Sequence, residues 1–311
     1  MRKEVVYTLK APFRENLNIY GYNFGHGEKS ACIVGPTRGN EVQQLYVCSQ
    51  LIRTLSELER TGAILAGHEI FVIPSVNHFS MNIEKRFWAM DNSDINRKFP
   101  GNPEGETTER IASGLFERVK DYNYGVQFAS FHTPGDFIPH VRMMETEHQN
   151  ASLANLFGLP FVVKRRPEPM DMRTLNYNWQ MTGTNAFSVY TNATDHIDEK
   201  SAAQAVSSVM RFLTRMGIIR YNCHSGFISS TIDEGSLMPI RADVSGIYRK
   251  LKSPGDEVRF GELIGEVIDP FEGEVISQIM SPSDGIIFFA HVKPLVLENC
   301  IIYQMIRRMH E

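Results

Sequence analysis

The feature that most constrains this chain is a regular alternation of strand-like and helix-like segments over its first 220 residues. Short apolar runs are followed by longer segments whose apolar residues recur at helical spacing. The expected strands are residues 30–35, 68–74, 125–131, 161–164 and 186–191, and the expected helices are residues 41–61, 106–121, 151–157 and 199–216. Buried strands linked by helices favour a mainly parallel sheet with helices on both faces. We therefore predict an α/β domain over residues 1–220.

The sequence changes character beyond about residue 222. Turns rich in Pro, Gly, Asp and Ser separate short β-rich segments, which predicts a small barrel-like β domain over residues 221–311. The segments that begin at Ser245 and Ser283 have similar patterns and resemble the half-repeats of biotinyl/lipoyl-like barrels. A carrier barrel presents a lysine at a hairpin tip, but the turn at residues 269–274 contains none. We expect a structural or lid role for this domain.

Composition excludes several classes of partner. The formal net charge of −4 gives no basic field for nucleic acid. No stretch approaches the ~20 apolar residues that span a bilayer, and the N-terminus lacks an apolar signal region. The four cysteines are widely spaced, with no CxxC pair, which favours reduced thiols and the cytoplasm. The expected partner is a small anionic ligand or substrate, and oligomerisation is left open.

Four short segments carry the candidate chemistry, together with Arg86. They are residues 35–41 (GPTRGNE), 94–101 (DINRKFPG), 130–133 (SFHT) and 186–190 (AFSVY). These segments resemble those of the zinc-dependent succinylglutamate desuccinylase/aspartoacylase family, and the resemblance extends over about residues 25–308. It implies a zinc carboxypeptidase-like or aminoacylase-like fold. It also implies deacylase or amidohydrolase activity on a small carboxylate-bearing N-acyl amino acid or a similar amide or ester.

The resemblance places two zinc ligands at Glu41 and His132. The family's remaining ligand is a histidine, and Arg38 stands in its position. Because an arginine stays protonated, it cannot be a ligand, and its charge repels a dication. Paired with Glu41, three residues further on, Arg38 would fill the vacancy left by zinc. The alternative is a rearranged zinc site in which His78, or less favourably His140, restores a third ligand.

The resemblance assigns the remaining roles as follows. Tyr190 stands at the position of the glutamate that acts as general base, and a phenol with an ordinary pKa of roughly 10 is a poor base at neutral pH. Asn96 and Arg97 correspond to residues that grip a substrate carboxylate, Arg97 through a bidentate fork. Arg86 is a second cation at the catalytic centre. With Arg38, these arginines predict a cation-rich pocket that suits a small anion.

Two functions of different classes follow from this pattern. The first is a metal-dependent hydrolase, with zinc as the cofactor that the family implies. The second is a catalytically inactive descendant that binds a small anion or a partner protein without zinc. The family resemblance favours the first function, whereas the residues at positions 38 and 190 favour the second.

Overall fold

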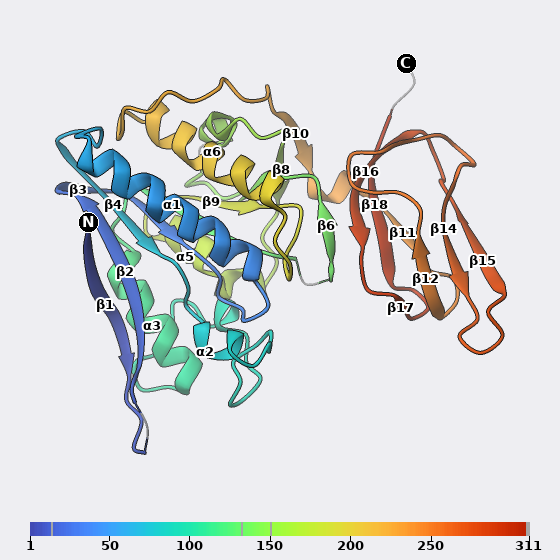
Figure 1. Ribbon diagram of the computed structural model, residues 1–311, viewed down its shortest axis with the longest axis horizontal. Coiled ribbons are helices and arrows are strands. Elements are labelled where there is room, and N and C mark those ends of the chain that lie inside the picture. The colour runs from blue at the N-terminus through green and yellow to red at the C-terminus, as the bar shows by residue number, and fades with distance from the viewer. Residues whose placement is uncertain (14, 132, 150, 309–311) are drawn as a thin grey trace.

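The computed structural model describes residues 1–13, 15–131, 133–149 and 151–308. It contains a nine-stranded sheet covered by helices, followed along the chain by two smaller antiparallel sheets (Figure 1). The predicted α/β class with a β-rich C-terminal part is confirmed.

The central sheet has the strand order β1-β2-β4-β3-β5-β9-β7-β8-β10. Its strands are β1 (Arg2–Leu9), β2 (Leu17–Gly25), β3 (Gly27–Val34), β4 (Gly67–Ile73), β5 (Tyr124–Phe128), β7 (His140–Met144), β8 (Phe161–Arg165), β9 (Asn185–Tyr190) and β10 (Ser230–Asp233). The sheet is mixed, because β1–β2, β2–β4 and β7–β9 are antiparallel pairs. The central strands β4, β3, β5 and β9 are parallel, so their carboxyl ends lie at one edge.

Helices cover both faces of this sheet. On one face lie α1 (Val42–Arg60) and α6 (Glu199–Arg215), and on the other lie α3 (Thr107–Val119) and α5 (Leu175–Met181). The alternation along β3 shows the two faces, because Ile33 belongs to the core under α1 and α6 whereas Cys32 and Val34 belong to the opposite core. The short helices are α2 (His78–Met81), α4 (Ala151–Ala154) and the 3₁₀ turns η1 (Ile95–Arg97), η2 (Asn155–Phe157), η3 (Asp171–Arg173) and η4 (Glu234–Ser236).

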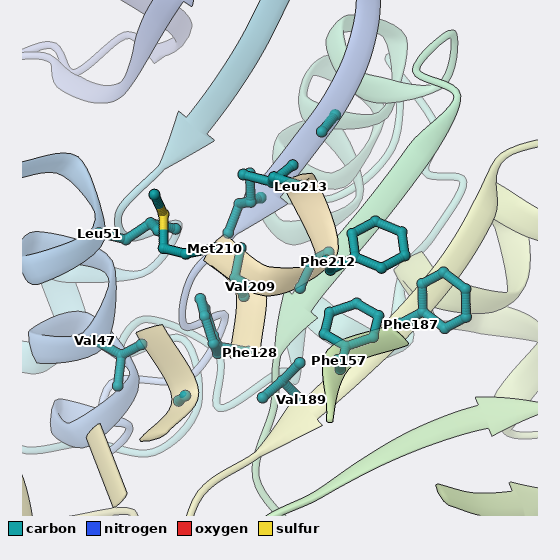
Figure 2. Packing of buried hydrophobic residues seen from close by; sticks show 14 of the residues in the cluster. Val47, Leu51, Phe128, Phe157, Phe187, Val189, Val209, Met210, Phe212 and Leu213 are labelled. Atoms are coloured by element: carbon teal, nitrogen blue, oxygen red, sulfur yellow. The ribbon is translucent and has the colours of Figure 1, made fainter. Parts of the chain in front are cut away.

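The core beneath α6 is dominated by aromatic packing. Figure 2 shows Val209, Phe212 and Leu213 of α6 packed near the strand residues Phe128 and Phe187. The ring of Phe212 stacks on Phe157 with centroids 4.3 Å apart. Burial of side chains this large stabilises the sheet that carries the candidate site.

The C-terminal sheets form a separate β-rich body (Figure 1). Their strands are β11 (Met238–Arg241), β12 (Gly246–Lys250), β13 (Glu257–Val258), β14 (Leu263–Ile268), β15 (Val275–Met280), β16 (Gly285–His291), β17 (Leu295–Val296) and β18 (Ile301–Arg307). One strand from the first half of the chain, β6 (Gly135–Phe137), pairs with β16. Conversely, β10 follows residue 220 in sequence but pairs with β8 in the central sheet. Each body thus contains one strand from the part of the chain that otherwise forms the other body.

Two further observations concern long apolar helices and the cysteines. Within the described ranges, no helix is long and apolar enough to cross a membrane. All four cysteines are free thiols.

Candidate functional site

The loop between β3 and α1 (residues 35–41) is fitted closely against the segment that ends at Arg86. The backbone N–H of Gly39 donates a hydrogen bond to the carbonyl of Arg86 at 2.9 Å. A Cβ atom on Gly39 would lie 2.2 Å from the carbonyl oxygen of Lys85, so only glycine allows this approach. The loop is therefore held in one position at the carboxyl edge of the sheet.

The carboxylate of Glu41 closes this loop from the N-cap position of α1. Its Oε2 accepts hydrogen bonds from the backbone N–H groups of Thr37 and Arg38, each at 3.0 Å. Its Oε1 accepts a hydrogen bond from the hydroxyl of Ser130 at 2.5 Å. Glu41 is completely buried. Both carboxylate oxygens are thus occupied by donors from the protein itself.

The side chain of Arg38 lies between two carboxylates. Its Nη1 is 3.3 Å from Oε1 of Glu41, and its Nη2 and Nε are 2.9 and 3.2 Å from Oδ2 of Asp94. The residue is 5% exposed. Burial alone lowers the pKa of Arg38, but the charges of Glu41 and Asp94 outweigh it and the net pKa is raised. The guanidinium is therefore a permanent buried cation beside Glu41.

Asp94 also orders the segment that follows it. Its Oδ1 accepts a hydrogen bond from the backbone N–H of Asn96 at 3.0 Å, which caps the turn η1. The side chain of Asn96 is 8% exposed and accepts a hydrogen bond from Nε2 of Gln127 at 2.9 Å. An amide is thereby fixed at the wall of the site.

Arg97 is the first member of a chain of ion pairs. Its Nη1 is 3.1 Å from Oδ1 of Asp171, whose Oδ2 is 2.8 Å from Nε of Arg165. Arg165 reaches Oε2 of Glu234 at 2.6 Å, and Oε1 of Glu234 is 3.2 Å from Nη1 of Arg142. Burial raises the pKa of Asp171, but hydrogen bonds from Glu168 and Arg165 outweigh it, so the net pKa is lowered. We call the five residues Arg97, Asp171, Arg165, Glu234 and Arg142 the arginine ladder.

Tyr190 ends strand β9 within this network. Its ring stacks on the buried His140 with centroids 4.8 Å apart, and the guanidinium of Arg142 lies 4.5 Å from the ring centroid. The residue is 8% exposed. Tyr190 therefore places an aromatic phenol at the site, where the family pattern has a carboxylate.

These groups enclose a small cavity of about 80 Å³ at the carboxyl edge of the sheet. Its lining residues are mostly polar: Arg38, Asn96, Arg97, Gln127, Ala129, Ser130, Phe131, Arg142, Met143, Met144, Arg165, Asp171, Thr174, Asn176, Ser188 and Tyr190. The structure thus brings together residues from segments more than 90 positions apart in sequence. Four sequence-derived candidates, at positions 38, 96, 97 and 190, lie on this wall.

The other candidates lie elsewhere. Arg86 donates from Nη2 to the carbonyl of Phe131 at 2.9 Å and lines a neighbouring cavity of about 400 Å³. Burial lowers the pKa of Arg86, and the nearby charge of Arg38 acts in the same direction. His78 is the first residue of α2 and is not among the lining residues of either cavity. His132 lies outside the described residues.

The residues with described positions do not match a zinc site. Zinc in a catalytic site takes three protein ligands with free lone pairs and one open position. Both oxygens of Glu41 accept hydrogen bonds, and the guanidinium of Arg38 lies beside them. Among the residues that the structure describes, no group of three or more His, Cys, Asp or Glu side chains could hold a metal ion. The spare candidate His140 is fully buried, with Nδ1 on the carbonyl of Ile138 at 2.8 Å.

Sequence reasoning missed several residues of the wall. Gln127 and Arg142 interrupt otherwise apolar strands, and a polar residue in such a run is a signal that could have found them. Asp171 and Arg165 of the wall gave no such signal, and neither did Glu234, which pairs with Arg165, because this pairing depends on contacts between distant segments.

Three comparisons relate this chain to known proteins. Residues 28–215 match the model of the succinylglutamate desuccinylase/aspartoacylase catalytic domain. An N-alpha-acetyl-L-2,4-diaminobutyric acid deacetylase from Halomonas elongata is 29% identical over 143 residues, which are 43% of this chain and 39% of that protein. The match thus spans well under half of the relative's length.

Solved structures give the same fold. A succinylglutamate desuccinylase/aspartoacylase from Rhodobacter sphaeroides has a TM-score of 0.80 at 17% identity, covering 99% of this chain and 95% of the other. The product-bound ectoine utilization protein EutE (DoeB) from Ruegeria pomeroyi has a TM-score of 0.76 at 18% identity, covering 93% and 89%. The matched domain covers more than half of the chain, and the protein therefore belongs to the succinylglutamate desuccinylase/aspartoacylase family of deacylase-type hydrolases.

Proposed function

We propose that this chain binds a small carboxylate-bearing amide, of the N-acyl amino acid class, without using zinc. The observation that carries the proposal is the position of Arg38, whose guanidinium lies between Glu41 and Asp94 beside a polar cavity. A fixed cation there compensates the charge of Glu41, which is the task of a metal ion in a zinc site.

The cavity wall supports a ligand of this class. Asn96, Asn176 and Ser188 offer amide and hydroxyl groups for an acyl-amide group, and Arg97 offers a guanidinium for a carboxylate. The relative from Halomonas elongata is named for its action on an N-acetylated diamino acid, and ligands of that size suit a small site. In this proposal Tyr190 packs against the ligand and takes no proton from water.

Isothermal titration calorimetry with N-acetylated amino acids tests this function. We expect binding to the purified protein both before and after dialysis against a chelator. Asn96→Ala and Arg97→Met should weaken binding, whereas Arg166→Gln, at a side chain that is 94% exposed, should not. Absence of binding by every N-acetyl amino acid, or binding that disappears with the chelator, would overturn the proposal.

A second candidate is a metal-dependent deacylase that cleaves the same class of amide. Family membership and the named activity of the Halomonas elongata relative favour it. This function requires a rearranged site in which His78 joins Glu41 and His132. Release of free amino acid from N-acetyl substrates by zinc-treated protein, lost in Glu41→Gln, would select it over the first proposal.

A further inference from the structure

The arginine ladder begins and ends with a cation. It runs Arg97–Asp171–Arg165–Glu234–Arg142, with each neighbouring pair in contact. Three guanidinium groups therefore share two carboxylates, which leaves one positive charge in excess. A further carboxylate, Glu168, is 3.5 Å from Arg165 but is 70% exposed, so water screens its charge.

The other charged groups near the cavity are closer to electrical balance. Arg38 lies between the two carboxylates of Glu41 and Asp94. Arg86 lies near enough for the charges of all three to act on it. Two cations and two anions thus cancel on this side. The excess positive charge of the site resides on the ladder.

The two ends of the ladder also keep unused hydrogen-bond donors. Among the residues that the structure describes, Arg97 makes its hydrogen bonds through Nη1, which donates to the carbonyl of Met170 and to Oδ1 of Asp171. Arg142 is 8% exposed, and its Nε makes no hydrogen bond with any residue that the structure describes. By contrast, Nε, Nη1 and Nη2 of Arg165 each contact a carboxylate. A buried donor without a partner is costly, so an acceptor at Arg142 would stabilise the site.

The orientation of Arg142 is fixed by its neighbours. Its guanidinium lies 4.5 Å from the ring centroid of Tyr190 and 5.6 Å from that of Phe131. In addition, Oε1 of Glu234 lies 3.2 Å from Nη1 of Arg142. Arg142 is therefore a preorganised group on the cavity wall, at low entropic cost to a ligand.

We propose that Arg97 and Arg142 together bind the single carboxylate of the ligand, and that the site selects monoanions over dianions. This inference rests on the proposed function and names the charge class of its ligand. One carboxylate matches the one excess charge of the ladder. A second carboxylate would enter a site with no cation left to compensate it, and its desolvation would be unfavourable.

Calorimetry of the full chain with N-acetyl-L-glutamine and N-acetyl-L-glutamate provides the test, because these probes have nearly the same shape and differ by one charge. We expect N-acetyl-L-glutamine to bind about tenfold more tightly, the size expected for one uncompensated charge in a half-buried site. Equal affinities, or tighter binding of N-acetyl-L-glutamate, would overturn the charge selectivity.

Variants of Arg142 test the contact itself. Arg142→Gln should weaken binding of N-acetyl-L-glutamine about tenfold, and Arg142→Lys should restore part of it by returning the charge without the fork. Glu234 still pairs with Arg165 in both variants, so the fold should persist, and circular dichroism checks this. Arg166→Gln is the matched control. Wild-type affinity in Arg142→Gln would overturn the role of Arg142. If neither probe binds the wild type but another N-acetyl amino acid does, this inference fails alone. If no N-acetyl amino acid binds, the proposed function fails, and this inference fails with it.

Discussion

The guanidinium of Arg38 lies 3.3 Å from the carboxylate of Glu41, and both side chains are almost completely buried. A buried carboxylate needs a compensating cation, and here that cation is covalently part of the chain three residues away. The pair also organises the surrounding loop, because Glu41 binds two backbone N–H groups and Arg38 reaches across to Asp94. Stability and function of this site therefore depend on the same ion pair.

Arg38→Met should destabilise the protein by about 3 kcal/mol, because it leaves Glu41 and Asp94 without their buried partner. Urea unfolding followed by circular dichroism measures this change. Arg60→Met is the control, since Arg60 pairs with Glu57 at the same three-residue spacing but with side chains 72% and 58% exposed. The control should lose much less stability, because water screens an exposed ion pair. Equal losses in the two variants would show that the buried pair does not stabilise the fold.

Gly39→Ala tests the fit of the loop that carries Arg38. The added Cβ would lie 2.2 Å from the carbonyl oxygen of Lys85, so the loop must shift, at a cost of about 1–3 kcal/mol. Gly235→Ala is the matched control, because a Cβ there meets no atom within 4 Å. Thermal unfolding of both variants is the measurement. A melting temperature of Gly39→Ala equal to that of the wild type would contradict the close fit.

His140 should make stability fall as the solution becomes more acidic. Burial lowers the pKa of His140 to about 3. The unfolded chain therefore takes up a proton below the ordinary pKa of about 6.5, while the folded protein stays neutral down to about 3. The stability from this group is fully present above pH 6.5 and is lost progressively as pH falls.

The variant His140→Phe isolates this effect, because phenylalanine can keep the stack on Tyr190 without titrating. Between pH 7 and pH 5 the free energy of unfolding should fall by about 2 kcal/mol more in the wild type than in the variant. Urea unfolding at both pH values gives the comparison. Parallel pH profiles would show that His140 does not contribute.

Much of the fold could be predicted from sequence because its strongest signals are local. Periodicity placed the helix at residues 41–61 close to α1 (Val42–Arg60) and the helix at residues 199–216 close to α6 (Glu199–Arg215). The exchange of β6 and β10 between the two bodies could not be predicted, because strand pairing across about 150 residues for β6 and about 70 for β10 leaves no local pattern. The domain boundary at residue 220 stays a prediction.

The candidate site was predictable only where a motif was continuous. Residues 94–97 and 186–190 form compact patterns, and their side chains at positions 96, 97 and 190 lie on one cavity wall. The sequence predicts a cation-rich pocket, but carboxylates compensate part of that positive charge. Arg38 and Arg97 each contact a carboxylate, at Asp94 and at Asp171 respectively. Such partners come from tertiary contacts, so a count of arginines in the sequence overstates the positive field. The roles of Glu41 and His132 as ligands stay predictions.

The last prediction concerns the two positions at which this chain departs from its family pattern. We expect the wild type to hold little zinc, because Arg38 lies against Glu41 and repels a dication. The double variant Arg38→His, Tyr190→Glu removes that charge and supplies a neutral nitrogen ligand and a carboxylate beside it. Its zinc content after equal exposure to metal should rise toward one ion per chain. Elemental analysis of both proteins measures this, and Arg166→His controls for adding a histidine at an exposed site.

The outcome separates the two functions proposed for the site. An empty wild type and a filled double variant would mean that the residues at positions 38 and 190 keep zinc out, and that the binding function is what the natural sequence retains. Stoichiometric, tightly held zinc in the wild type would mean that other ligands have replaced the one lost at position 38. His78→Ala would then be expected to abolish that zinc, since it lies just after β4, whose carboxyl end shares the edge of the sheet with Glu41. Zinc that survives His78→Ala would exclude His78 as the substitute ligand.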